Sequence, residues 1–171
     1  MMKKLFALML ALCLVLCSAA LAENEISWDQ VEPLLTENGI NGEFVTFEQI
    51  AVKVWIPEGM TAVEDMPENY IGYFASEDGD AVAVVYANAE GMDLETYAQV
   101  VAENGGANIE TGTVNGLPCL TYEFTNDAGL CQVCSFTTEA GYILEVAVGP
   151  LPNDSAKLGA SVVLASIQAA E

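Results

Sequence analysis

The sequence predicts an α+β fold, in which an antiparallel sheet of about six strands is flanked by amphipathic helices. Several runs alternate apolar and polar residues, and the short turns that join consecutive runs require antiparallel pairing. Three other segments place apolar residues at helical spacing, and such helices must cover a face of the sheet. No repeat, linker or low-complexity tract interrupts residues 23–171, so we expect a single domain there.

A helix is predicted near the start of this domain, in SWDQVEPLLTENGI, residues 27–40. Ser27 followed by Gln30 has capping-box spacing, and Gly39 is placed to end the segment. Pro33 lies between them and removes a backbone donor. We therefore expect either one short helix or a helix in two pieces.

Strand periodicity follows in EFVTFEQIAVKVWIPEGM, residues 43–60, where Pro57 and Gly59 close the alternating run. The next stretch predicts a hairpin. Apolar runs at residues 70–75 and 81–87 flank an Asp-Gly turn, which is a strong hairpin signal.

A second helix is predicted in MDLETYAQVVAENGG, residues 92–106, with Asp93 as its N-cap and Gly105 beyond its end. The turns NDAG and EAG then separate three strands of a meander, which are residues 116–125, 130–138 and 142–148. The chain closes with NDSAKLGASVVLASIQ, which predicts a third helix capped near Asp154.

The first 22 residues have the anatomy of a secretory signal peptide. Two lysines precede an apolar run, and Ala20-Leu21-Ala22 forms a small-x-small cleavage site. We expect export with cleavage after Ala22, a secreted or envelope-associated protein, and no stable membrane insertion afterwards. Two alternatives remain, because the apolar run is nearly long enough to anchor in a bilayer and Cys17 offers a position for a lipid. Lipoprotein signals, however, want a small residue where Leu16 stands.

Residues 23–171 contain all 25 acidic residues against two lysines, Lys53 and Lys157, which gives a formal charge of −23. Nucleic acid is excluded as a partner, because its recognition needs clustered cations that neutralise phosphates. The acids are spread along the chain, which is typical of a charged extracellular surface rather than of a cation-buffering tract.

The chain contains no histidine and no arginine. This removes Ser-His-Asp and Cys-His nucleophile systems, imidazole metal sites and arginine clamps, and we expect no cofactor. A hydrolase that uses only two carboxylates passes this filter.

The element order resembles that of the PsbP-like fold. The residues that carry the likeness are W-I-P at 55–57, D-L-E-T-Y at 93–97 and the turn V-N-G-L-P at 114–118, followed by the last amphipathic helix. This group includes a photosystem subunit, Ran-binding Mog proteins and secreted bacterial proteins of the DcrB type. The resemblance spans most of residues 23–171. It implies an α/β/α sandwich with a binding or assembly role, and it transfers no functional residue.

The tetrapeptide CQVC, residues 131–134, is the stretch that most resembles a chemical motif. A redox pair needs it at a helix N-terminus and a zinc knuckle needs it in a tight turn, whereas Val133 and its flanks favour a strand. In a strand Cys131 and Cys134 face opposite sides with Cα atoms ~10 Å apart, too far to pair or to hold one zinc.

Cys119, on the preceding strand, is the candidate disulfide partner of Cys134. If NDAG forms a four-residue loop, the two cysteines share a sheet face as diagonal neighbours ~7 Å apart, which a bulge would close into a bond. If Gly129 instead makes a three-residue loop, the register slips by one and they face opposite sides. The alternative role for these thiols is that of small buried apolar groups.

The turn SEDGD places Glu77, Asp78 and Asp80 within four residues. Such oxygen clusters hold Ca²⁺ in some turns, so the three form a weak calcium candidate without the length of an EF-hand loop. A charged hairpin tip is the alternative. Five aromatic residues either line a binding groove or, as their spacing favours, belong to the core: Trp28, Trp55, Tyr70, Tyr73 and Phe74.

These observations predict an exported, non-enzymatic domain that binds a protein or small-ligand partner at or outside the bacterial cell envelope. One alternative is a glycosidase-like, carboxylate-only hydrolase, which needs two acids facing each other across a groove with one of them buried. The other alternative is a weak binder of divalent cations.

Overall fold

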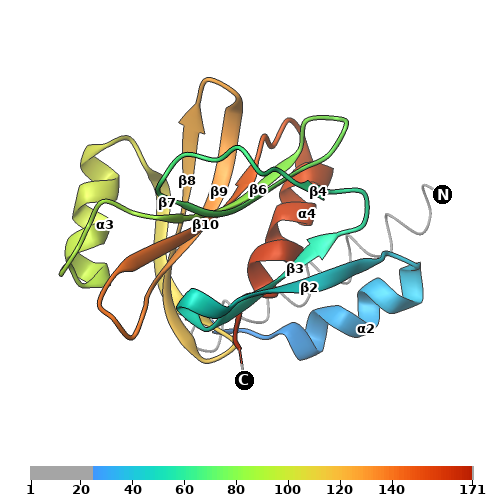
Figure 1. The fold of residues 1–171 in the computed structure, drawn as a ribbon, viewed down its shortest axis with the longest axis horizontal. Coiled ribbons are helices and arrows are strands. Elements are labelled where there is room, and N and C mark those ends of the chain that lie inside the picture. Colours follow the sequence, from blue (N-terminus) through green and yellow to red (C-terminus); the bar gives the residue numbers. More distant parts are fainter. Residues whose placement is uncertain (1–24, 171) are drawn as a thin grey trace.

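A computed structural model describes residues 25–170, so the predicted signal segment and its cleavage site lie outside the described part. In chain order the elements are β1 (Glu25–Ile26), α2 (Trp28–Asn38), β2 (Gly42–Phe47), η1 (Glu48–Ile50), β3 (Val52–Pro57), β4 (Thr61–Ala62), β5 (Tyr70–Ala75), β6 (Ala81–Tyr86), α3 (Leu94–Glu103), β7 (Ala107–Val114), β8 (Leu117–Asn126), β9 (Gly129–Thr137), β10 (Ile143–Gly149), α4 (Asp154–Ala165) and β11 (Gln168–Ala169). The predicted α+β class is confirmed (Figure 1).

The large sheet has the strand order β1-β7-β8-β9-β10-β6-β5-β4. The short β1 runs parallel to β7, and the other neighbours are antiparallel. The predicted β5–β6 hairpin and the β8–β9–β10 meander are both confirmed. The sequence did not predict β7, which pairs with β8 along most of its length.

A second, smaller sheet has the order β11-β3-β2. The segment that alternates before Pro57 therefore forms a hairpin of its own, β2 and β3, instead of joining the large sheet as we expected. The physical reason is α4, which packs against β3 on one side and against β9 and β10 on the other. Helix α4 lies between the two sheets and separates them (Figure 1).

The helices cover different surfaces of the large sheet. Helix α3 contacts β7, β8 and β9, whereas α4 contacts β9 and β10 from within the space between the sheets. Helix α2 packs against α4. Because α4 is enclosed on several sides, Ala160, Val163 and Ala165 are each only 1% exposed. No helix within residues 25–170 has the length and apolarity needed to cross a bilayer.

Helix α2 begins as predicted but is capped differently. It is one continuous helix through Pro33, and it ends at Gly39 in the left-handed conformation. Ser27 is its N-cap residue, yet the Ser27 side chain makes no capping hydrogen bond. The capping-box prediction is therefore wrong, because the N–H of Gln30 donates to the Ser27 backbone carbonyl at 3.2 Å and not to its hydroxyl. The Oδ1 atom of Asn115 accepts the N–H of Trp28 at 2.6 Å.

Asn115 is the point where distant parts of the chain meet. It lies in the VNGLP turn between β7 and β8, and its Nδ2 donates to the carbonyl oxygens of Ala165 and Ile167, at 2.8 Å each. The same side chain caps α2. One amide thus joins the start of α2, the end of α4 and the large sheet.

The aromatic residues divide between core and surface. Trp28 and Trp55 are buried, with ring centroids 5.8 Å apart, in the core shared by α2, α4 and both sheets. Tyr70, Tyr73 and Phe74 are half-buried along β5. The core interpretation is confirmed for the two tryptophans.

Candidate functional site

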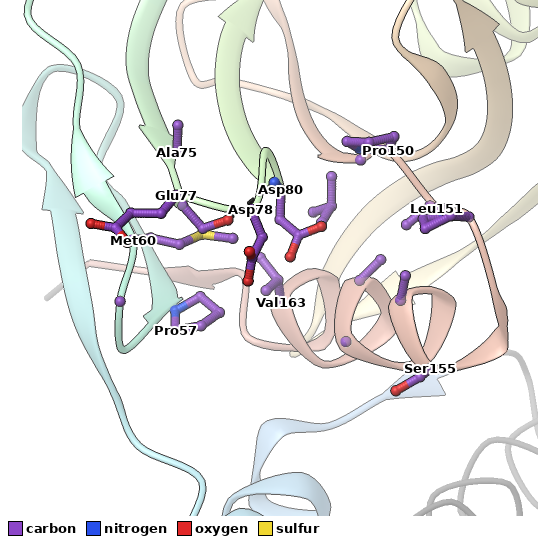
Figure 2. A pocket seen from close by; sticks show the side chains of 18 of the residues that line it. Pro57, Met60, Ala75, Glu77, Asp78, Asp80, Pro150, Leu151, Ser155 and Val163 are labelled. Carbon is purple, nitrogen blue, oxygen red and sulfur yellow. Dashed lines mark hydrogen bonds between the residues drawn. The ribbon is translucent and has the colours of Figure 1, made fainter.

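A groove of about 1010 Å³ opens at the end of the molecule where the two sheets and α4 meet. Three loops and one helix face form it (Figure 2). The loops are residues 57–61 after β3, residues 75–80 at the β5–β6 tip, and residues 148–153 before α4. The helix face is the part of α4 that carries Ser155, Ala156, Gly159, Ala160 and Val163.

The β5–β6 tip is a tight turn held by its own hydrogen bonds. The N–H of Ser76 donates to the Asp80 carbonyl at 2.9 Å, and the N–H of Asp80 donates to the Ser76 hydroxyl at 3.1 Å. Gly79 has φ +92°, a conformation that favours glycine. The turn therefore presents Glu77, Asp78 and Asp80 from a fixed backbone.

The loop after β3 forms the facing wall. Its backbone is tied to the connection between α2 and β2, because the N–H of Glu58 donates to the Asn41 carbonyl at 2.9 Å. The Asn41 side chain also donates to Glu58 Oε2 at 3.0 Å, which orients that carboxylate. Figure 2 shows Pro57 and Met60 on this side of the groove, opposite Pro150 and Leu151.

The third loop leads from β10 into α4. The N–H of Leu151 donates to the Leu130 carbonyl at 2.8 Å, which holds the loop on the start of β9. Asn153 then caps α4 by accepting the N–H of Ala156 at 3.0 Å, one residue before the predicted cap at Asp154. This loop closes the groove on the side of the large sheet.

The floor of the groove is apolar. Val148, Leu151, Ala160 and Val163 line it and are all buried. Gly159 lies beside them on α4, and a Cβ atom added there would meet nothing within 4 Å. The groove thus has open space next to Gly159 of α4.

The rim of the groove carries four carboxylates and no lysine, from Glu58, Glu77, Asp78 and Asp80. All four residues are exposed. The carboxylates of the three at the hairpin tip have no hydrogen-bond or ion-pair partner within residues 25–170. The groove is therefore strongly negative with no internal neutralisation.

The two lysines of the described chain are engaged elsewhere. Lys157 Nζ lies 3.5 Å from Glu123 Oε1, and Lys53 Nζ lies 5.2 Å from the centroid of the Phe44 ring. Neither lysine lines the groove.

The hairpin acids do not converge as metal ligands. Among residues 25–170, no three or more acidic or cysteine side chains are grouped so as to hold a metal ion. Glu77, Asp78 and Asp80 share the rim of one groove, and the weak calcium site at this turn stays a prediction.

The pairing of β8 with β9 has the register that we expected for a four-residue NDAG loop. Thr121 pairs with Cys134, and Thr125 pairs with Leu130, so Cys119 and Cys134 are diagonal neighbours on one sheet face. Both are buried, and all three thiols of the described chain are free. The disulfide between Cys119 and Cys134 remains a prediction, now with the register that it requires.

The buried thiols influence each other. A hydrogen bond from Cys134 lowers the pKa of Cys119, and the same bond, together with burial, raises the pKa of Cys134 well above its ordinary value. Burial also raises the pKa of Cys131, which lies apart from this pair. Cys119 is therefore the thiol of the pair that ionises first.

Comparison with solved structures identifies the architecture. Cyanobacterial PsbP (CyanoP) from Synechocystis sp. PCC 6803 superposes with a TM-score of 0.55 at 13% identity, over 75% of this chain and 92% of that one. The chain has the PsbP-like fold. The predicted resemblance is confirmed for the fold, and at this identity it concerns the fold alone.

Two further structures are similar. The Ran-binding protein Mog1p of Saccharomyces cerevisiae matches with a TM-score of 0.48 at 12% identity, over 77% of this chain and 97% of its own. LpqN of Mycobacterium tuberculosis, described as involved in cell envelope biogenesis, matches with a TM-score of 0.48 at 11% identity, over 82% of this chain and 97% of its own. No protein-family model matches the sequence, and neither does any curated protein.

The other face of this PsbP-like sandwich contains a polar cluster that the sequence did not reveal. Glu145, on β10, accepts hydrogen bonds at Oε1 from the hydroxyls of Tyr97 at 2.6 Å, of Ser135 at 3.4 Å and of Tyr122. Tyr97 comes from α3, so the cluster fastens that helix to the sheet. The feature of the sequence that could have indicated this cluster is Glu145, the single acidic residue within the apolar run ILEVAVG, residues 143–149.

The two tyrosines respond to this environment. Burial, followed by the interaction with Glu145, raises the pKa of Tyr97 and of Tyr122 well above the ordinary value of 10.0. The neutral phenols are thus favoured in the folded state. None of these residues lines the groove, and the bond from Tyr97 to Glu145 links α3 to β10.

Proposed function

We propose that this chain is an exported, non-enzymatic binding domain that acts at or outside the bacterial cell envelope, and that it binds its partner in the groove. The observation that carries this proposal is the groove itself. It joins an apolar floor to an exposed acidic rim, at the end of the molecule where α4 meets both sheets. Binding sites commonly combine apolar area with a few oriented polar groups in this way.

The chemistry of the groove favours binding over hydrolysis. A carboxylate-only hydrolase needs one acid buried enough to keep its proton while a second stays ionised. All four rim acids lie on exposed residues, and three of them project from a single turn. The absence of histidine and arginine from the sequence points the same way.

Export is supported by the sequence. The signal-peptide anatomy of residues 1–22 predicts translocation, and a domain with a formal charge of −23 suits an extracellular or envelope setting. With two lysines in the mature segment, anionic partners are disfavoured.

Photo-crosslinking from the groove tests the proposal. A benzophenone amino acid at Gly159 projects into open space, so the full chain should fold and be exported with it. The matched control is the same group at Gln99, which is exposed on α3 over the opposite sheet face. We expect a discrete adduct from position 159 in the envelope or extracellular fraction and none from position 99.

Equal adducts from both positions, or none from position 159, would overturn binding in the groove. Turnover assays on glycan and peptide libraries with the exported protein complete the test. We expect no turnover. Turnover that disappears in the Asp78→Asn/Asp80→Asn variant would replace the binding proposal with the hydrolase.

A further inference from the structure

We infer that the occupant of the groove is a basic amphipathic peptide segment of a partner protein, with Lys or Arg side chains at the rim and apolar side chains on the floor. This inference rests on the proposed function and names the chemistry of its ligand. It follows from the charge, the floor and the shape of the groove.

The charge of the rim selects a cation. Glu58 stands on the loop after β3, and the other three carboxylates stand on the hairpin tip. Figure 2 shows the side chains of Asp78 and Asp80 directed from the hairpin toward α4 and Val163. Clustered carboxylates without counter-charges repel one another, so a cationic ligand gains attraction and also relieves this repulsion.

The floor selects an apolar component. Behind the buried Val148, Leu151, Ala160 and Val163, the half-buried side chains of Met60, Pro150 and Ala156 also line the groove, so accessible apolar area remains beside the carboxylates. A small polyamine or a metal ion would neutralise the rim carboxylates but leave this apolar surface exposed to water. A ligand that alternates apolar and basic side chains covers both.

The shape selects a segment of chain. The groove is at the upper end of the volumes, roughly 300–1,000 Å³, that hold small ligands, and its lining includes exposed residues on each side. Thr61, Pro152 and Ser155 are exposed residues of its lining. Gly159 also lines the groove without a side chain, which lets a peptide backbone approach α4 closely.

Fluorescence anisotropy with defined peptides tests the inference on the exported protein. The probe is a short labelled peptide of alternating Leu and Lys. Two matched probes replace Lys by Glu or Leu by Ser, and unlabelled spermidine serves as a competitor. We expect saturable 1:1 binding of the Leu/Lys probe that weakens as salt is raised toward about 0.15 M, no binding of the Leu/Glu probe, and at least about tenfold weaker binding of the Ser/Lys probe.

Variants locate the binding. Asp78→Asn/Asp80→Asn removes two rim charges and should weaken binding about fivefold. The matched control Glu64→Gln/Asp65→Asn removes two exposed charges from the loop between β4 and β5, which does not line the groove, and should leave binding unchanged. Gly159→Trp fills the groove and should weaken binding at least about tenfold without loss of fold.

Three results would overturn the inference. Equal weakening by the rim and control variants would show attraction to overall negative charge only. Equal binding of the Ser/Lys and Leu/Lys probes, or full displacement by spermidine, would show a cation site without an apolar component. No binding of the Leu/Lys probe, together with a crosslink from position 159, would leave the proposed function standing and remove the basic peptide as its ligand.

Discussion

The hydroxyl of Ser166 accepts the backbone N–H of Trp55 at 2.8 Å, in a site where Ser166 is 0% exposed. Ser166 follows the last turn of α4 and Trp55 lies on β3, so this bond joins the central helix to the small sheet. The same hydroxyl donates to the carbonyl of Val163 at 2.6 Å. The floor of the groove and the wall that begins at Pro57 are held together by this contact.

Replacing Ser166 by Ala should lower the free energy of unfolding by roughly 1–3 kcal/mol, because the Trp55 N–H is left buried without an acceptor. Urea unfolding measures the change. Ser161→Ala is the control, since the Ser161 hydroxyl bonds only to the Lys157 carbonyl of its own helix. Similar effects of the two substitutions would show that the bond across the elements contributes nothing of its own.

Gly159→Ala should raise the free energy of unfolding by about 0.5–1 kcal/mol, because alanine is the better helix former and its Cβ meets no atom. Gly39→Ala should do the opposite, since Gly39 ends α2 with φ +66°. Thermal or urea unfolding of both variants gives the comparison. A loss of stability in Gly159→Ala would mean that α4 does not have the open face described above.

The elements that the sequence predicted correctly are those with local signals. The β5–β6 hairpin follows from an Asp-Gly pair between two apolar runs, and α3 begins at Asp93, whose side chain accepts the N–H of Thr96 at 2.8 Å. Asn108 and Gly112 explain why β7 escaped prediction. Asn108 has φ +52° beside an irregular register, and Gly112 interrupts a run whose side chains are mostly exposed.

The division into two sheets depends on contacts between remote residues. Gln168 pairs with Lys53, and the capping of α2 depends on Asn115, a residue from another turn. Hydrophobic periodicity identifies a strand but does not say which sheet receives it. The same limit applies to the groove. The hairpin acids were visible in the sequence, whereas their placement opposite Glu58 and above Val163 required the fold.

The free energy of unfolding should fall as the pH rises above about 10, which is the ordinary pKa of a tyrosine, because the pKa values of Tyr97 and Tyr122 are raised in the folded chain. In that range the unfolded chain loses phenolic protons while the folded chain retains them, so each rise in pH favours unfolding. Tyr122→Phe should reduce this slope by up to about 1.4 kcal/mol per pH unit. Tyr142→Phe is the matched variant, because it removes a tyrosine hydroxyl on an exposed residue outside the Glu145 cluster. Identical slopes in the wild type and Tyr122→Phe would contradict the cluster at Glu145.

Refolding in the presence of oxidised glutathione should convert Cys119 and Cys134 into a disulfide by thiol–disulfide exchange, because both thiols are buried in the folded chain and are accessible only while it folds. The Cys119 thiolate attacks glutathione disulfide and expels one glutathione, and Cys134 then attacks the mixed disulfide and expels the second. Mass spectrometry should show a loss of about 2 Da and one alkylatable thiol in the exported, unfolded protein. Cys131→Ser should still form the bond, and Cys134→Ser should not. If three thiols can still be alkylated after prolonged oxidation, Cys119 and Cys134 do not form a disulfide and are buried core residues only.

The most direct test of the groove is a nuclear magnetic resonance titration of the isotopically labelled exported protein with the Leu/Lys peptide. We predict saturable amide shifts confined to the four segments that line the groove, which are residues 57–61, 75–80, 148–153 and 155–163. The same titration on Gly159→Trp should show these shifts strongly reduced. Shifts centred on residues 63–68 or on α3, or spread evenly over the acidic surface, would contradict the assignment of the groove as the binding site.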